Sequence, residues 1–477
     1  MSAQVFPMFP SDSPQAQGDW RKSFFEKLES ILDEMEKGAS MNNLLDITRT
    51  VFDRKSSILG EIPSGIIEAR FSSFLNQEHF DCPLCAGKLK SRGKHKRKLE
   101  TMAGEFTLER PYFYCANCKK GFYPLDEILE LSSSSKQYDV QDVEAWLSSE
   151  LPFETAAETY RRCTGGKIGA GHMHDRTRRI AEDLDILDVC PTREEIERKI
   201  EETRGGAFRR PVMVLAVDGA HAPVRPEPSP RKGKRGKGRW KESKGFRLYL
   251  IDGDGIVHLA SWHRIATDRE LLEDLETIEK AGLVCEGKAR LSLLGDGAGW
   301  IWNRIGELFP SARRVLDYYH CSEHLHGVAR AQYGAGSEEA GYWVEATLVR
   351  LFHDKAGYVI GGLKRMIPAS PEAAEEIRKL VNYLTVHKDK INYGKLRRGG
   401  YHIGSGAIES ANKFIGHVRL KRSGAWWYPS RANEILKLRC AKYNGVYDRV
   451  IELYKEKDQE RLRQKKFLKP GKDESPK

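Results

Sequence analysis

The feature that most constrains the fold is a continuous apolar run, Val212-Met-Val-Leu-Ala-Val217, followed at once by Asp218 and a glycine. A strand that is apolar at every position has both faces buried, as in sheets covered by helices on both sides. A second, mostly apolar run, Leu291-Ser-Leu-Leu294, leads through one glycine to Asp296 and another glycine. Helical patterns and further apolar strands lie between and after these runs. We therefore expect an α/β domain over residues 208–450.

The elements expected in this domain follow from apolar periodicity and from turn residues. The predicted strands are Val212–Val217, Phe246–Ile251, Ile256–Trp262, Leu291–Leu294 and Arg314–Leu316, with the turn Asp252-Gly-Asp-Gly255 closing a hairpin. The predicted helices are Thr267–Gly282, Trp300–Leu308 and one that begins near Tyr319. The order is βββαβαβα. Residues 330–400 are charged and helical in pattern, which predicts a helical insertion.

Three carboxylates are the candidate catalytic residues of this domain. Asp218 and Asp296 each end a buried strand and precede a glycine, which lets the chain turn sharply and leaves the acid at the rim of the sheet. Glu409 lies one position off the apolar stripe of a later amphipathic helix and can point to the same rim. Taken singly, each Asp also fits a turn residue, and Glu409 also fits an ion pair with Lys413.

A cluster of three such acids predicts a bound cation. Close carboxylates raise one another's pKa unless a positive charge neutralises them. Oxygen ligands suit Mg²⁺ or Mn²⁺. Two such ions can activate a water or a 3′-hydroxyl and stabilise the leaving oxygen of a phosphodiester. The cluster therefore favours phosphodiester chemistry.

Two Cys-x-x-Cys pairs predict a separate metal module, a zinc ribbon over residues 76–130. Four thiolates enclose Zn²⁺ with no open coordination position, which makes such a site structural. The total of nine cysteines is odd, and metal thiolates in a reducing compartment fit this pattern better than disulfides do. Four unconnected buried cysteines are the alternative. The zinc ligands are Cys82, Cys85, Cys115 and Cys118.

Three helical patterns within residues 136–200, with the turn signal Thr164-Gly-Gly-Lys between the second and the third, predict a helix-turn-helix. The third helix carries Arg176, Arg178 and Arg179 outside its apolar stripe and can lie in a major groove of DNA. A charged, solvated surface is the competing interpretation. Residues 1–75 are expected to form an amphipathic helical region, and residues 451–477 a charged tail.

The charge balance points to a polyanionic partner. Lys and Arg number 79 against 68 Asp and Glu, a net charge of +11. The basic, glycine-rich stretch 231–239 can track a phosphate backbone, or it can be a solvated loop. Tryptophans 426 and 427 can stack on unpaired bases, although a core position fits them as well. The candidate DNA contacts of these segments are Lys232, Lys234, Arg235, Arg419, Arg422, Trp426 and Trp427.

The sequence has neither a long uncharged apolar stretch nor an amino-terminal basic segment followed by an apolar core. Membrane insertion and secretion are therefore not expected. We expect a cytoplasmic protein that associates with the nucleoid when it is bound to DNA.

The motifs around Asp218, Asp296 and Gly404-Ser-Gly-Ala-Ile-Glu409-Ser, taken together, resemble the DDE transposases of bacterial insertion sequences. The likeness covers roughly residues 80–450, with zinc ribbon, helix-turn-helix and catalytic core in the order of that family. The basic, aromatic segment 419–427 is similar to the end of such cores. Asp317-Tyr-Tyr-His320 is similar to an Asp/Cys-x-x-His element of Mutator-like relatives.

The resemblance implies an RNase H-like mixed sheet with a helical insertion, and Asp218, Asp296 and Glu409 as catalytic, Mg²⁺-binding residues. It implies strand cleavage and strand transfer at the ends of the protein's own mobile element, with double-stranded DNA as the partner and a homo-oligomer on DNA. Asp317 and His320 would be accessory residues. Two alternatives remain open, a catalytically inactive zinc-containing DNA-binding regulator and a structure-specific nuclease of the same fold.

Overall fold

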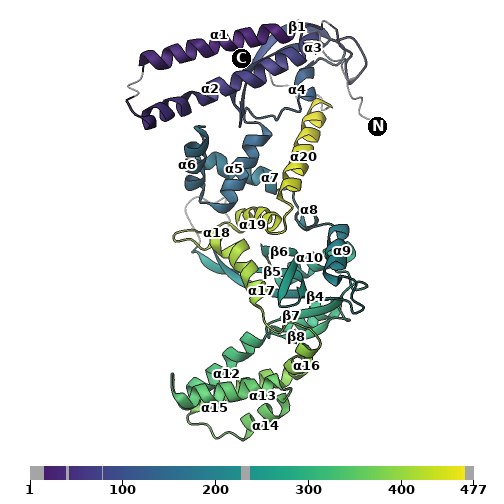
Figure 1. The fold of residues 1–477 in the computed structure, drawn as a ribbon. Helices are drawn as coiled ribbons and strands as arrows, with labels where there is room; N and C mark the ends of the chain where they lie inside the picture. Colours follow the sequence, from purple (N-terminus) through teal and green to yellow (C-terminus); the bar gives the residue numbers. More distant parts are fainter. Residues whose placement is uncertain (1–15, 39–41, 78, 227–236, 468–477) are drawn as a thin grey trace. The chain divides into compact units, whose positions relative to one another are not determined.

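The computed structural model describes residues 16–38, 42–77, 79–226 and 237–467. The chain divides into two compact units, one made of Met1–Ile180 with Ile451–Lys477 and the other of Ala181–Val450 (Figure 1). It is a mixed α/β protein with a three-stranded and a five-stranded sheet. No helix among the described residues is long and apolar enough to cross a membrane.

The first unit begins with the expected amphipathic helices, α1 (Ala16–Gly38), α2 (Leu44–Arg70) and the short α3 (Ser72–Leu75). Helices α1 and α2 pack against each other, and α2 also packs on the strand β2 (Gly104–Cys115). This contact is close because α2 carries Gly60 there. A Cβ at Gly60 would lie 2.1 Å from the carbonyl oxygen of Glu105.

The three-stranded sheet occupies the region predicted as a zinc ribbon. β1 (Lys90–Thr101) and β2 form a long antiparallel hairpin, and β3 (Lys120–Phe122) pairs with the other side of β2. The short helix α4 (Pro124–Ile128) follows. Alternate residues of β2 are buried, as expected for a sheet with one face in a core. That core contains Phe74, Leu99, Leu108, Phe113 and Phe122.

The three helices predicted next are present as α5 (Tyr138–Glu150), α6 (Phe153–Thr164) and α7 (Ala170–Ala181). Gly165 ends α6 with a φ of 77°, a left-handed conformation that glycine adopts without strain. The three helices share a small core of Val140, Ala156, Ala157, Tyr160 and Met173. The carboxyl-terminal region expected as a charged tail forms the helix α20 (Tyr447–Phe467), which belongs to this unit from Ile451 onward.

The second unit is built on the five-stranded sheet. Its strands are β4 (Val212–Val224), β5 (Arg239–Asp252), β6 (Gly255–Ile265), β7 (Arg290–Gly295) and β8 (Arg313–Leu316). They lie in the order β6-β5-β4-β7-β8, with β4, β7 and β8 parallel to one another and β5 antiparallel to both of its neighbours. All five predicted strands are present in this sheet.

One strand differs from its prediction in length. β4 continues from Val217 to Val224, because β5 pairs with it along its whole length. Asp218 is therefore not the last residue of its strand. It lies beyond the point where β4 and β7 stop pairing, since the last pair of their ladder is Ala216 and Leu294.

Helices surround the sheet and form the predicted insertion. The elements near the sheet are α8 (Ile186–Val189), α9 (Arg193–Arg204), α10 (Asp268–Lys280), the π-helical turn η1 (Ile301–Ile305), α11 (Gly306–Leu308) and α12 (Tyr318–Tyr333). The insertion contains α13 (Glu338–Phe352), α14 (Ala356–Arg365), α15 (Pro371–Val386), η2 (Lys388–Lys390) and α16 (Tyr393–Arg398), which Figure 1 shows grouped with α12. The expected helix around Glu409 is α17 (Gly406–Ala411), a π-helical segment η3 (Asn412–His417) and α18 (Val418–Leu420), followed by α19 (Pro429–Tyr443).

Candidate active site and metal centre

Asp218 on β4 and Asp296, which directly follows β7, lie at equivalent positions of two neighbouring parallel strands. Each stands two residues beyond the last pair of the β4–β7 ladder, Ala216 and Leu294. Both side chains are partly buried. The backbone N–H of Gly219 donates to Asp218 Oδ1 at 2.7 Å, and the N–H of Ala298 donates to Asp296 Oδ1 at 2.8 Å. These local bonds orient both carboxylates where the two strands separate.

Glu409 comes from α17 and is held by the start of its own helix. The hydroxyl of Ser405 donates a hydrogen bond to Glu409 Oε1. The backbone N–H of Ser405 donates to Asp317 Oδ1 at 2.7 Å, and Tyr318 N–H donates to the carbonyl of Ile403 at 2.8 Å. The segment before α17 is therefore tied to the start of α12. Glu409 itself is exposed.

The charges of these acids act on one another. The pKa of Asp218 is raised to about 6, mainly by burial and also by the negative charges of Asp296 and Glu409. The Gly219 N–H and the charge of His320 oppose this rise. The three predicted acids and His320 therefore lie within electrostatic range of one carboxylate.

Asp317 and His320 form a pair at the start of α12. Asp317 is the N-cap of this helix and is fully buried. It accepts hydrogen bonds from the backbone N–H of His320 at 3.0 Å and from the imidazole Nδ1 at 2.7 Å. The bond to Asp317 raises the pKa of His320 to about 9. Burial acts to raise the pKa of Asp317, but the hydrogen bonds from His320 and Ser405 outweigh it and leave that pKa lowered.

The donor set of the acid cluster suits a hard divalent cation. Carboxylate oxygens are the ligands that Mg²⁺ and Mn²⁺ prefer, and a cation would oppose both the burial and the repulsion that raise the pKa of Asp218. The three acids are not gathered as closely as the cysteines of the first unit. Among the described residues, only the four cysteines bring one ligand atom each to within 4.8 Å of all the others.

The four cysteines form a candidate zinc centre in the first unit. Cys82 Sγ lies 3.8 Å from Cys118 Sγ, and Cys85 Sγ lies 3.6 Å from Cys115 Sγ. The N–H of Leu84 points to Cys82 Sγ at 3.5 Å, and the N–H of Cys118 points to Cys115 Sγ at 3.3 Å. Such N–H donors stabilise thiolates. The prediction that the two pairs come together is confirmed, and the quartet can hold a structural zinc ion.

The third helix of the predicted helix-turn-helix requires one correction. Arg179 is exposed and Arg178 is partly buried, but Arg176 is 3% exposed. Its guanidinium donates to Glu144 at 3.1 Å and to Gln141 at 2.7 Å. Arg176 is therefore part of a buried network and does not present its charge to DNA. The sequence pattern missed this because both partners lie on another helix, α5.

The segment after η3 requires two more corrections. Arg419 and Trp427 are buried, with 2% and 9% of their surface exposed. Trp427 pairs with the end of β4 through backbone hydrogen bonds to Pro223 and Arg225, and its indole lies 4.8 Å from the Arg419 guanidinium. Neither residue is placed to contact DNA. Trp426 and Arg422 are exposed, and the predicted contacts Lys232, Lys234 and Arg235 lie outside the described residues.

One residue that touches the acid cluster was missed from the sequence. Asn412 Nδ2 donates a hydrogen bond to Asp218 Oδ2 at 2.7 Å. Asn412 is the first residue of η3 and lies three residues after Glu409. That helical spacing is the signal that could have found it, since residues three apart share a helix face.

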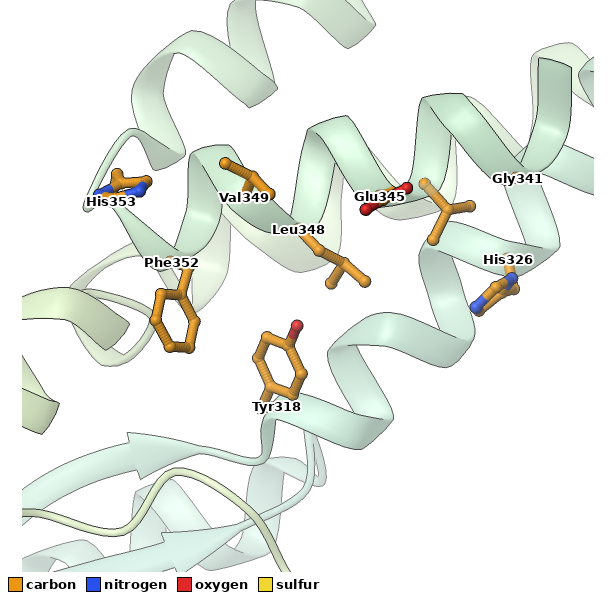
Figure 2. A pocket seen from close by; sticks show the side chains of 9 residues that line it. Tyr318, His326, Gly341, Glu345, Leu348, Val349, Phe352 and His353 are labelled. Atoms are coloured by element: carbon orange, nitrogen blue, oxygen red, sulfur yellow. The ribbon is translucent and has the colours of Figure 1, made fainter. Parts of the chain in front are cut away.

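A cavity with a volume of about 390 Å³ lies in the helical insertion, between α12 and α13. Figure 2 shows Tyr318 and Phe352 near one end of it, and His326 and Glu345 near the other. None of the three acids lines it. It is thus separate from the acid cluster.

Comparisons with known proteins place the chain in a family. A model described as an uncharacterised protein family, UPF0236, matches residues 86–457. A "UPF0236 protein in vanSb 3′region" of Streptococcus gallolyticus is 23% identical over 342 residues, covering 69% of each chain. A solved Drosophila P element transposase strand transfer complex matches 67% of this chain and 81% of that chain at 12% identity, with a TM-score of 0.25, which does not establish a shared fold. The protein belongs to the UPF0236 family.

Proposed function

We propose that this protein is a DNA transposase that cleaves and joins phosphodiester bonds at the ends of its own mobile element. The observation that carries the proposal is the placement of Asp218 and Asp296 at equivalent positions of adjacent parallel strands. The charge of Glu409, from a helix far along the chain, acts on the same Asp218 carboxylate. Three acids in this relation suit metal-dependent phosphodiester chemistry.

The topology supports an RNase H-like core. The sheet carries three antiparallel strands in chain order and then two strands parallel to the first, on its other side. The helical insertion lies between β8 and the helix of Glu409, where the resemblance to DDE transposases requires it. The first acid lies in the first strand of this sheet, the second directly follows the fourth strand, and the third follows the insertion.

In this proposal Asp218, Asp296 and Glu409 hold Mg²⁺ or Mn²⁺. Bound to these carboxylates, such a cation would supply the acidity that activates a water or 3′-hydroxyl and the positive charge that neutralises a leaving oxygen. The hydrogen bond from Asn412 holds the Asp218 carboxylate in an orientation in which it can bind the cation. His320, which Asp317 keeps protonated at neutral pH, places a positive charge beside the acids, where the scissile phosphate approaches.

The proposed DNA contacts come from exposed side chains of both units. Arg179 on α7, Arg422 and Trp426 after η3, and the basic strand β1 present their side chains to solvent. Contacts to phosphates supply most of the sequence-independent affinity for DNA. The zinc ribbon would hold β1 in place. Because transposition acts on two DNA ends, we propose that the protein works as a homo-oligomer on double-stranded DNA.

The test uses the purified full-length protein, Mg²⁺ or Mn²⁺, and labelled DNA that carries the ends of the element flanking its gene. The wild type should nick the ends and join them to target DNA. The variants Asp218→Asn, Asp296→Asn and Glu409→Gln should bind the ends but lose cleavage by about 100-fold or more, because each removes one negative charge from the metal site. Asp252→Asn and Asp254→Asn, in the exposed turn between β5 and β6, are matched controls that should keep the activity.

The alternatives give different results in the same assay. Cleavage without joining indicates a structure-specific nuclease. Specific binding without cleavage by the wild type indicates a DNA-binding regulator and contradicts the transposase proposal. If Glu409→Gln cleaves at the wild-type rate while both Asp variants are inactive, the third acid has been assigned wrongly.

A further inference from the structure

A row of three residues runs across the sheet beside the acid cluster. Asp218 on β4 is paired with Gly245 on β5, and Gly245 is paired with His263 on β6. Directly opposite residues of antiparallel strands direct their side chains to the same face of the sheet. Gly245 has no side chain, which leaves room there for the imidazole of His263. A Cβ at Gly245 would lie 2.1 Å from His263 Nδ1, which shows that the imidazole lies over this glycine.

Asn412, on the π-helical segment η3, contacts this row of residues. Its Nδ2 donates to Asp218 Oδ2 at 2.7 Å, and its side chain acts on the pKa of His263, opposing the reduction that burial causes. An ionised carboxylate accepts hydrogen bonds and donates none, so Asn412 must turn its NH₂ group to Asp218. The amide oxygen, Oδ1, then remains as an acceptor on the side that faces His263. Asn412 begins the π-helical segment η3, and such segments are common at functional sites.

The polar atoms around this contact are buried and still available. In the described part of the chain, His263 Nε2, Asn412 Oδ1 and His417 Nε2 have no hydrogen-bond partner. His263 is 1% exposed and Asn412 is 5% exposed. These two residues, His417 and Ser243 line a cavity of about 10 Å³, which is room for one water molecule. Buried polar atoms without partners are rare in proteins, so a group of them beside a reactive carboxylate calls for a function.

His263 is uncharged at neutral pH, which suits its position beside the acid cluster. Burial lowers the pKa of His263 to about 3, with the charges of Arg247 and His417 acting in the same direction. A neutral imidazole has one N–H donor and one acceptor nitrogen. His263 can therefore donate to Asn412 Oδ1, directly or through one water, without adding a charge to the acid cluster.

We propose that Asn412 and His263 are positioning residues that fix the orientation of the Asp218 carboxylate for cation binding. Asn412 holds the carboxylate, and His263 holds Asn412. This inference rests on the proposed function, because it assumes that Asp218 is a metal ligand. It gives Asn412 and His263, which are not among the three acids, a role in cation binding. It also accounts for the glycine at position 245, which leaves the space that the imidazole occupies.

The experiment measures Mn²⁺ binding to the full-length protein without DNA, by electron paramagnetic resonance titration. Asn412→Ala and His263→Phe should weaken Mn²⁺ binding between about 10-fold and 100-fold, the usual effect of losing a group that orients a metal ligand. His263→Gln keeps a side chain that can donate a hydrogen bond and should recover most of the affinity. His258→Phe is the matched control, since it removes another imidazole of β6, a partly buried one that pairs with Asn444.

Asp218→Asn separates failure of this inference from failure of the proposed function. If wild type binds Mn²⁺ and Asp218→Asn does not, the acid cluster is a cation site. Wild-type affinity in both Asn412→Ala and His263→Phe would then overturn the positioning role alone. If wild type and Asp218→Asn bind Mn²⁺ equally, both the cation site and the inference fail. Where His263→Phe does not fold, Asn412→Ala decides the matter, because its side chain is smaller than the original, and wild-type Mn²⁺ affinity in that variant overturns the positioning role.

Discussion

His320 Nδ1 lies 2.7 Å from Asp317 Oδ2, and the same carboxylate oxygen accepts the backbone N–H of His320 at 3.0 Å. The other oxygen of Asp317 accepts the N–H of Ser405 at 2.7 Å. One buried carboxylate thus joins the start of α12 to the segment that carries Glu409. It also sets the charge of the imidazole beside the acid cluster, because a histidine bonded to a carboxylate holds its proton more tightly.

The Asp317–His320 pair makes stability depend on pH. The pKa of His320 is raised to about 9, so its stabilising effect is complete below its ordinary value near 6.5 and is lost as the pH rises through about 9. The pKa of Asp317 is lowered, so the stability that its carboxylate contributes is lost only when the pH falls below the ordinary pKa range of an aspartate. We expect His320→Gln to lower the melting temperature clearly at about pH 6 and little at about pH 10. An equal reduction of the melting temperature at both pH values would show that the Asp317–His320 ion pair does not stabilise the protein. The effect should be modest, since His320 is partly exposed.

The zinc centre predicts a local loss of structure. Cys115→Ser should reduce bound zinc below about half an equivalent and unfold the module of β1 to β3, because the free energy of metal binding is part of its folding free energy. The second unit should stay folded. Elemental analysis and limited proteolysis measure the two effects. Cys163→Ser, at an exposed cysteine outside the quartet, is the control and should change neither. A full equivalent of zinc in Cys115→Ser would show that the quartet is not the zinc site.

Arg176 and Arg179 lie on the same helix, α7, but we expect Arg176 to matter for stability and Arg179 for DNA binding. Arg176→Ala leaves the buried Glu144 carboxylate without its guanidinium partner, which should lower the free energy of unfolding by about 3–5 kcal/mol. Arg179→Ala removes an exposed charge and should leave stability almost unchanged. Its effect should appear in DNA binding, as a uniform weakening and a salt dependence reduced by about one unit of slope. Chemical denaturation and fluorescence anisotropy at several salt concentrations measure the two. A stable Arg176→Ala protein would show that the ion pair does not hold the helices.

Periodicity and turn signals were enough to predict the strands of the second unit in their order. An apolar run that is followed within two residues by Asp-Gly is a strong local pattern, and the runs 212–217 and 291–294 both form buried parts of strands, β4 and β7. The length of β4 could not be predicted, because its extension to Val224 depends on pairing with β5. Local sequence does not report such pairing.

The errors at single residues have one physical cause. Arg176 and Arg419 were predicted as DNA contacts and Trp427 as either a stacking or a core residue, and all three are buried. Arg176 and Trp427 are held by partners on elements distant in the chain. Asn412 was missed for the same reason, since its partner Asp218 is 194 residues away. Local patterns predict which faces are apolar, whereas the partner of a buried polar group depends on tertiary packing.

Trp426 and Trp427 are neighbours with opposite environments, which allows a paired test of DNA contact. Trp426 is 42% exposed, whereas the Trp427 indole donates to the carbonyl of Leu420 at 3.2 Å and its backbone pairs with the end of β4. Trp426→Ala should weaken binding to DNA with unpaired bases at the cleavage site by about 10-fold, since stacking of one base contributes about 1–3 kcal/mol. Binding to a fully paired duplex should change much less.

Trp427→Ala should instead destabilise the protein by about 3–5 kcal/mol, the usual cost of removing a large buried aromatic side chain. Anisotropy with frayed and fully paired DNA measures the first effect, and chemical denaturation the second. Trp426→Phe, which keeps an aromatic face, should recover most of the lost affinity. If Trp426→Ala weakens binding to both DNAs equally, then Trp426 contributes to the general DNA surface and not to a stack on an unpaired base. If Trp426→Ala leaves binding to both unchanged, the segment after η3 does not contact DNA through this side chain.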